Sequence, residues 1–140
     1  MNTLNENALK FIKSELKKVQ IEISSKESGR EGLDFLIGRN ELYLKSIDLD
    51  NQRSIKILKQ DIGVLSDTLF IALVLLINEE PQGLYLIPSQ QLSQPDNYIF
   101  FENEVGLMPS LSNWEIKVFT KAIPELNKFS LSNMIDKLKS

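Results

Sequence analysis

The sequence predicts one α+β domain, in which a central β-sheet is joined by an N-terminal helix and a short C-terminal helix. Residues 69–77 are apolar without alternation, as in a strand that is buried on both faces. Residues 4–18 repeat apolar side chains at helical spacing, and a shorter stripe of the same kind recurs over 131–138. A chain of 140 residues with 42% apolar content is suited to a single domain, 1–140, with one core.

The N-terminal half is predicted to contain a helix followed by a β-meander. Thr3-Leu4-Asn5-Glu6 matches a capping box, which marks the start of the helix. The apolar period then changes from 3.6 to 2, which indicates a half-exposed strand. In order, we expect a helix over 4–18, a strand over 19–24, a polar loop over 25–32, and a hairpin of strands 33–37 and 42–49 around the turn 38–41. A shift in apolar phase after Lys45 predicts a bulge or bend in the second hairpin strand.

The register of this first hairpin follows from burial of one of its faces. Pairing Phe35 with Leu44 keeps the apolar side chains of both strands on one face, and burial of one face is what fixes a register. In that register Asp34 lies directly opposite Lys45, and Tyr43 lies on the same face as both.

The C-terminal half is predicted to be organised around a second, buried hairpin. Leu69–Ile77 and Leu84–Ile87 are apolar, and the segment between them contains Asn, Pro and Gly, which favour a turn. The remaining elements are expected to be a short strand over 54–58 with a turn or single helical turn up to Gly63, a helical turn over 89–94, a brief strand over 98–101, a loop over 102–113, an edge strand over 114–119, and a final helix capped by Ser130.

Composition excludes many kinds of chemistry, because the chain contains no Cys and no His. Disulfides, thiolate nucleophiles, Cys or His zinc sites, and triads that use an imidazole are therefore absent. The net charge is −3, from 16 basic and 19 acidic residues, and this does not favour a nucleic-acid partner. Residues 1–60 carry 11 basic and 9 acidic side chains, whereas 61–140 carry 5 and 10. The N-terminal half is thus the better place for an anion.

The N-terminal segment also bears on localisation. It is amphipathic and charged throughout, without an apolar signal region or a small-residue cleavage site. No apolar run approaches the roughly 20 residues of a transmembrane helix. We therefore expect a soluble, cytoplasmic protein with no membrane contact.

The order of helix, three strands and buried strand pair, with an acidic residue in one strand and a lysine in the next, resembles the restriction-endonuclease-like, or PD-(D/E)XK, superfamily. Gly32-Leu33-Asp34 looks like the family's glycine–apolar–Asp strand. Leu42-Tyr43-Leu44-Lys45 looks like its (D/E)XK strand, with Lys45 in the lysine place. Leu84–Ser89 resembles a later strand of nuclease-like proteins. The resemblance covers roughly residues 5–90 and implies an α/β-like fold around a mixed central sheet.

In this family, the Asp and a Glu or Gln two residues before the Lys hold magnesium over the scissile phosphate. Here Tyr43 stands at the second position, and a phenol with a pKa near 10 supplies no anionic ligand at neutral pH. The resemblance therefore implies a degenerate member, a non-catalytic binding domain without a cofactor. The alternative is a Mg-dependent nuclease that hydrolyses phosphodiesters, with Asp34 as metal ligand and Lys45 at the same site. A cross-strand ion pair between Asp34 and Lys45 is the purely structural explanation.

Aromatic residues near the C-terminal strand are the second candidate site. Trp114, Tyr98 and Phe100 are the candidate binding residues, because aromatic side chains anchor many interfaces; ordinary packing in the core and at its rim is the alternative. An edge strand over 114–119 can add to another sheet, which predicts a homodimer formed by strand pairing. We expect the partner of this surface to be a protein.

Overall fold

Two β-sheets organise the part of the chain that the computed structural model describes, residues 3–21, 24–25, 33–96 and 98–139. The larger sheet is mixed, with strand order β1-β2-β3-β5-β6; β3 and β5 are parallel, and the other neighbours are antiparallel. Its strands are β1 (Ser24–Ser25), β2 (Leu33–Ile37), β3 (Asn40–Asp48), β5 (Leu69–Ile77) and β6 (Glu80–Pro88). The smaller sheet is antiparallel, in the order β4-β8-β7, with β4 (Ser54–Leu58), β7 (Phe100–Asn103) and β8 (Asn113–Lys117). The predicted α+β class with a mixed central sheet is thereby confirmed at this coarse level.

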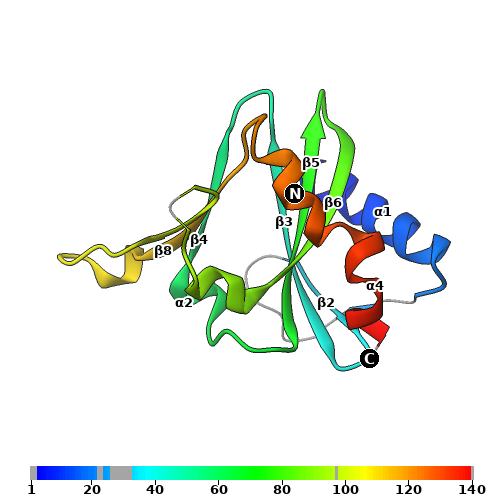
Figure 1. Ribbon diagram of the computed structural model, residues 1–140, viewed down its shortest axis with the longest axis horizontal. Coiled ribbons are helices and arrows are strands. Elements are labelled where there is room, and N and C mark those ends of the chain that lie inside the picture. Colours follow the sequence, from blue (N-terminus) through cyan, green and yellow to red (C-terminus); the bar gives the residue numbers. More distant parts are fainter. Residues whose placement is uncertain (1–2, 22–23, 26–32, 97, 140) are drawn as a thin grey trace.

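The first and the last helix of the chain lie against the larger sheet (Figure 1). The described helices are α1 (Thr3–Lys18), α2 (Lys59–Ile62), α3 (Ile123–Leu126) and α4 (Leu131–Lys139), with 3-10 turns over Ser89–Ser93, Pro109–Leu111 and Asn127–Phe129. The buried stripe of α1, which is Ala8, Ile12 and Leu16, packs against strands of the larger sheet. The N-terminal and C-terminal helices were both predicted from this kind of apolar stripe. None of the described helices is long and apolar enough to cross a membrane.

Strand β5 is the centre of the core, as its uninterrupted apolar sequence predicts. Every residue over 69–76 is buried, because β3 and β6 pair with its two edges and other elements cover its faces. The β5–β6 hairpin turns at Asn78-Glu79, where φ is +52° and +65°. A tight turn with two positive φ values favours Asn. The turn is therefore shorter than the predicted segment 78–83, and β6 begins at Glu80.

The register predicted for the first hairpin is wrong by two residues. Phe35 pairs with Leu42, and Asp34 pairs with Tyr43 in place of Lys45. The turn is a two-residue Gly38-Arg39 turn, with Gly38 at φ +58°, in place of the expected four residues. Of the bulge or bend predicted after Lys45, the bulge is wrong, because β3 pairs with β5 without interruption over 41–48.

The end of α1 explains why the strand predicted over 19–24 is reduced. Gln20 adopts a left-handed φ of +62°, and the N–H of Ile21 bonds the carbonyl of Leu16 at 2.9 Å. The N–H of Gln20 bonds the carbonyl of Lys17 at 3.0 Å, which completes a Schellman motif. Ile21 is consequently turned back and buried, and the described strand starts only at Ser24. Part of the predicted strand, residues 22–23, and most of the predicted loop, residues 26–32, lie outside the described residues.

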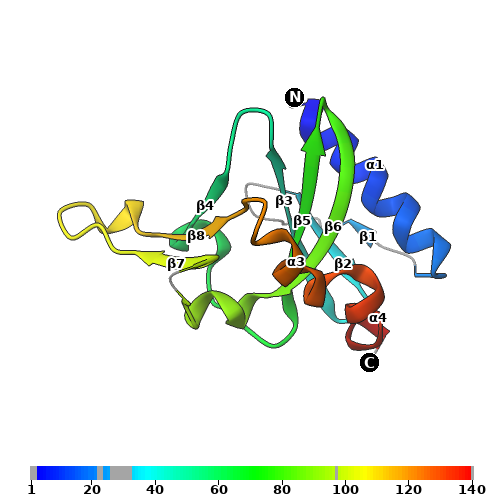
Figure 2. The same ribbon diagram turned by 45° about the horizontal axis from the view of Figure 1, so that its top comes forward.

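The prediction that 114–119 is an edge strand is wrong. β8 lies in the middle of the smaller sheet, where Trp114 pairs with Ile57 of β4 on one side and with Glu102 of β7 on the other. The alternation that suggested an edge reports only that one face of the strand is polar. Pairing of this strand with a second copy would require β4 or β7 to leave it. The smaller sheet projects away from the body of the molecule in both views (Figure 1 and Figure 2).

Candidate functional site

Tyr43, which stands where the resemblance places the second metal ligand, is part of the core. Its side chain is 0% exposed, and its strand is paired with β2 at Asp34 and with β5 at Ile71. The side chain of Asp34 lies outside the described part of the structure. The register places positions 34, 43 and 45 on one face of the sheet. Position 34 is opposite position 43, and position 45 lies two residues further along β3, where the side chain returns to the same face.

Lys45 is directed to the ring of this buried tyrosine. Its Nζ lies 5.5 Å from the centroid of Tyr43, within the range of a cation–π contact. Lys45 is half-buried and also lines a polar hollow of about 370 Å³. The other residues of this hollow are Ser46, Gln52, Ser54, Ile55 and Lys56. Among the described residues, no group of three or more acidic, His or Cys side chains is arranged to hold a metal ion.

The three candidate binding aromatics do not form one surface. Phe100 is 2% exposed and packs edge-on against Phe129, with ring centroids 6.1 Å apart. Tyr98 is partly exposed and packs edge-on against Phe119, with centroids 5.0 Å apart. Trp114 is half-buried and faces Lys59. Phe100 is therefore a core residue, and Tyr98 and Trp114 have separate neighbours.

Trp114 belongs to a projecting segment that we name the arm, which consists of β7, β8 and the loop 104–112 between them. It is the yellow ribbon that extends from the body in Figure 1 and Figure 2. Three large apolar side chains at its end, which we name the tip, are exposed: Leu107 by 99%, Met108 by 55% and Leu111 by 44%. The stretch 105–112 contains no charged residue. An exposed apolar group of this kind is typical of an interaction site.

A charge network joins α2 to the end of β7 that leads into the loop of the arm. The ammonium group of Lys59 at the start of α2 contacts the carboxylates of Glu102, at 2.5 Å, and Glu104, and it lies 4.4 Å from the ring centroid of Trp114. Burial lowers the pKa of Lys59, but the hydrogen bonds to the two carboxylates outweigh it, so that the pKa is raised above 10.5. The hydrogen bond from Lys59 is the main cause that lowers the pKa of Glu104.

Side-chain hydrogen bonds on one face of the smaller sheet join β7 to β8. The amide of Asn103 donates to the side-chain oxygen of Asn113 at 2.9 Å and to Glu115 at 3.0 Å. Burial would raise the pKa of Glu115, yet hydrogen bonds from Asn103 and Ser54 and nearby lysines lower it. The tip is therefore carried on an ordered support, in contrast to an exposed loop without fixed neighbours.

Sequence reasoning missed the tip because it assigned 102–113 to a loop from its Gly, Pro, Ser and Asn content. A signal was present in the same stretch. Leu107, Met108 and Leu111 are large apolar residues in a segment whose Gly106 and Pro109 prevent a regular buried element. Large apolar residues in a segment that cannot form a buried helix or strand indicate an exposed contact surface.

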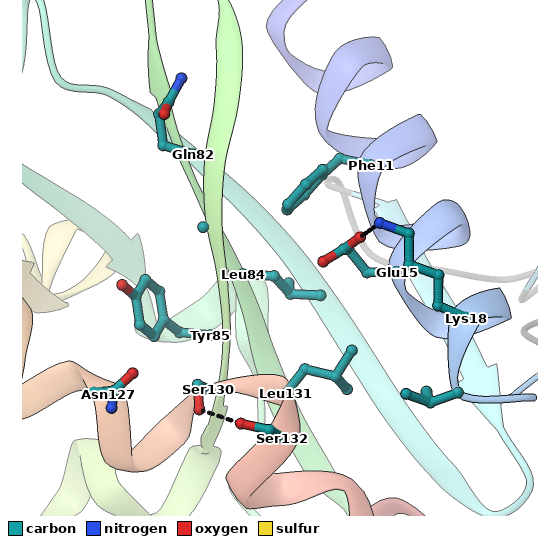
Figure 3. Close-up of a pocket in the computed structure, with 12 residues that line it drawn as sticks. Phe11, Glu15, Lys18, Gln82, Leu84, Tyr85, Asn127, Ser130, Leu131 and Ser132 are labelled. Carbon is teal, nitrogen blue, oxygen red and sulfur yellow. Dashed lines mark hydrogen bonds and ion pairs between the residues drawn. The ribbon is translucent and has the colours of Figure 1, made fainter.

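A second hollow, of about 400 Å³, lies along β6 between α1 and the C-terminal segment (Figure 3). Phe11, Leu84 and Leu131 supply apolar walls, and Glu15 pairs with Lys18 at 2.7 Å on the side of α1. On the other side, Tyr85, Asn127, Ser130 and Ser132 supply polar groups. The volume is in the range of sites for small ligands.

The edge of β6 next to this hollow is poorly suited to the addition of a peptide strand. The pairing of β6 with β5 shifts between Leu75 and Leu76, so that Gln82 is an additional residue of a bulge. Pro81 supplies no N–H, and Tyr85 is already bridged by Ser130. Such features protect edge strands from further pairing.

Comparison of the chain with protein-family models, with curated proteins and with solved structures gives no match.

Proposed function

We propose that the chain is a non-catalytic binding domain, built on a degenerate nuclease-like scaffold, that acts by contacting another protein chain through the tip of the arm. The observation that carries the non-catalytic part is the complete burial of Tyr43. Resemblance to the PD-(D/E)XK superfamily gives this position to a metal ligand. A magnesium ion requires an octahedron of oxygens and usually keeps several waters, which a buried aromatic ring excludes.

The place of Lys45 supports the same proposal. In an active site of this kind the lysine would face a phosphate, whereas here its ammonium group is 5.5 Å from the centre of the Tyr43 ring. The cation–π contact gives the lysine a structural role that does not depend on a metal. The mixed sheet, with β3 parallel to β5, is compatible with the proposed scaffold.

The tip supports a protein as the bound partner. Leu107, Met108 and Leu111 offer apolar area without a hydrogen-bonding pattern that would read a nucleotide. Glu102 and Glu104, which lie where β7 leads into the loop of the arm, and the acidic excess over 61–140 disfavour a polyanion at this surface. An apolar pocket on a protein is the complement of this chemistry.

Calorimetric titration with Mg²⁺ and Mn²⁺, together with an assay for cleavage of DNA and RNA, tests the non-catalytic part. We expect neither cleavage nor a binding isotherm that differs between the natural protein and Asp34→Ala. Micromolar metal binding that is lost in Asp34→Ala, with cleavage that is lost in Lys45→Ala, would establish the Mg-dependent nuclease instead. Both variants are to be checked for folding by circular dichroism, so that a lost signal is not assigned to an unfolded protein.

A further inference from the structure

The hollow along β6 contains a carboxylate among apolar walls. Its volume is about 400 Å³, and we name it the Glu15 hollow. In Figure 3, Phe11 and Glu15 project from α1 toward β6. Leu84 of β6 and Leu131 at the start of α4 supply the apolar walls that face them. Leu84 is 7% exposed, and Phe11 and Leu131 are half-buried. The carboxylate of Glu15 therefore borders a space that is otherwise lined on this side by hydrocarbon.

One oxygen of Glu15 is directed into the hollow. Its Oε2 accepts a hydrogen bond from Nζ of Lys18 at 2.7 Å, and Figure 3 shows the other oxygen turned away from Lys18, toward Leu84. The side chain of Lys18 is 70% exposed, whereas that of Glu15 is 28% exposed. Ion pairs with such an exposed lysine are weak. A cation that enters the hollow can therefore bind Glu15 without displacing a strong internal partner.

An aromatic ring lies beside this carboxylate. Phe11 precedes Glu15 by four residues, so the two side chains are neighbours on one face of α1 (Figure 3). A cation held by the carboxylate comes close to the ring, and aromatic rings attract ammonium groups through their negative faces. Phe11 thus favours the same kind of ligand group as Glu15.

The opposite wall of the hollow supplies no second charge. The hydroxyl oxygens of Ser130 and Ser132 lie 3.3 Å apart in a hydrogen bond, and the amide of Asn133 donates to Ser130 Oγ at 3.2 Å. Burial raises the pKa of Tyr85 above 10.0, so that its phenol is neutral at pH 7. Among the described lining residues, Glu15 is the acid and Lys18 the base. The complementary ligand therefore has a single positive group on an apolar body.

The edge of β6 indicates a small molecule in place of a peptide. A peptide that adds to a sheet needs a free strand edge. Here Gln82 forms a bulge, Pro81 has no N–H, and Tyr85 is bridged by Ser130. The volume of about 400 Å³ lies within the range of small-ligand sites.

We propose that the Glu15 hollow binds a small primary amine that has an apolar body of the size of one ring. Alkyl amines have a pKa of about 10, as lysine does, and are positively charged at pH 7. The ammonium group bonds Glu15 beside the ring of Phe11, and the body lies against Leu84 and Leu131. This goes beyond the proposed contact with a protein, because the hollow borders the larger sheet and the tip belongs to the smaller one.

Three probes with one apolar body test the proposal on the natural protein. They are phenethylamine, phenethyl alcohol and phenylacetate, which differ in their polar group. In amide NMR titrations at about pH 7, phenethylamine should shift the signals of Leu84 and Leu131 with a Kd of about 0.1–5 mM, as expected for a ligand of this size. Phenethyl alcohol should bind at least about fivefold more weakly, because it lacks the charge, and phenylacetate should not bind.

Two variants should change the affinity for phenethylamine in opposite directions. Glu15→Gln keeps the shape of the side chain and should weaken binding at least about tenfold, because a charge-assisted hydrogen bond is lost. Lys18→Met should strengthen binding by about two- to fivefold, because the competing ammonium group is removed. Glu125→Gln is the matched control, since Glu125 is exposed and does not line the hollow, and it should bind as the natural protein does.

Equal binding of the three probes overturns the proposal, as does the absence of shifts at Leu84 and Leu131 up to about 20 mM phenethylamine. So does a Glu15→Gln variant that is folded by circular dichroism and keeps the natural affinity. These titrations involve neither metal nor nucleic acid. Their failure can therefore be distinguished from the failure of the non-catalytic proposal.

Discussion

Replacement of Lys59 by methionine should loosen the arm where β7 leads into the loop 104–112. Methionine keeps the unbranched side chain but removes the ammonium group that contacts Glu102 at 2.5 Å and lies 4.4 Å from the Trp114 ring centroid. A partly exposed ion pair contributes about 0.2–1 kcal/mol, and a cation–π contact about 0.5–1 kcal/mol, more where it is desolvated. The Lys59 side chain is only 25% exposed, so we expect a total loss of about 1–2 kcal/mol.

Trp114 is the only tryptophan in the chain, and its fluorescence reports on this contact directly. With a slope of about 2 kcal/mol per molar urea, the loss corresponds to a decrease of roughly 0.5–1 M in the midpoint that fluorescence detects. If the arm opens separately from the body, this transition will precede the one seen by circular dichroism, which follows the larger sheet and the helices.

Lys117→Met supplies the comparison within the same sheet. The Lys117 ammonium lies at the same 4.4 Å from an aromatic centroid, that of Phe101, but does not contact Glu102 or Glu104. Its effect should be smaller, because Lys117 is exposed and loses only the ring contact and an electrostatic interaction with Glu115. Equal shifts in the two variants, or an unchanged fluorescence midpoint in Lys59→Met, would show that the charge network does not hold the arm.

Other consequences follow from burial and from titration. Tyr43→Glu should lower stability by several kcal/mol, because position 43 is fully buried, whereas Tyr98→Glu at an exposed position should have a smaller effect in urea unfolding. Leu107→Ser should change stability by less than about 0.5 kcal/mol, while Leu73→Ala, at a side chain that is 0% exposed, should lose about 2–5 kcal/mol. Asp96 accepts the N–H groups of Tyr98, Ile99 and Phe100, each at 2.9 Å, and these bonds lower its pKa below 3.8 against the opposing effect of burial. The contribution of Asp96 to the free energy of unfolding is present above pH 3.8 and is lost as the pH falls through the folded-state pKa. The difference in stability between the natural protein and Asp96→Ala should therefore shrink in acid. The pKa of Glu104 is lowered from 4.5, and that of Lys59 is raised from 10.5. The Trp114 fluorescence should therefore be constant between pH 4.5 and pH 10.5. It should lose the contribution of Glu104 as acid is added and that of Lys59 as base is added.

Apolar periodicity was sufficient to predict the elements that are defined by one apolar face or by one uninterrupted apolar run. The uninterrupted apolar run of β5 predicted a strand covered on both faces, and the stripe of α1 predicted a helix against the sheet. In both, burial is a local property of the side chains themselves. The final helix after Ser130 is of the same kind.

Register and edge position are not contained in that periodicity. A shift by two residues keeps every side chain of β2 on its own face, so pairing Phe35 with Leu44 or with Leu42 satisfies the apolar pattern equally well. The length of the turn decides between the two, and Gly38 at φ +58° permits the two-residue turn. The central position of β8 was missed for a related reason, because alternation shows how many faces are exposed but not how many edges are paired.

The candidate catalytic positions and the arm lie on different sheets of the molecule and differ in exposure. On the face shared by positions 34, 43 and 45, Tyr43 lies in the core and Lys45 lies beside its ring. A rigid scaffold suits the proposed binding role, because it fixes the direction and spacing of what projects from it. Here β4 and β7 hold β8 from both sides, and the loop that carries the apolar tip joins its first residue, Asn113. The pairing of β8 that prevents edge addition thus also supports the exposed tip.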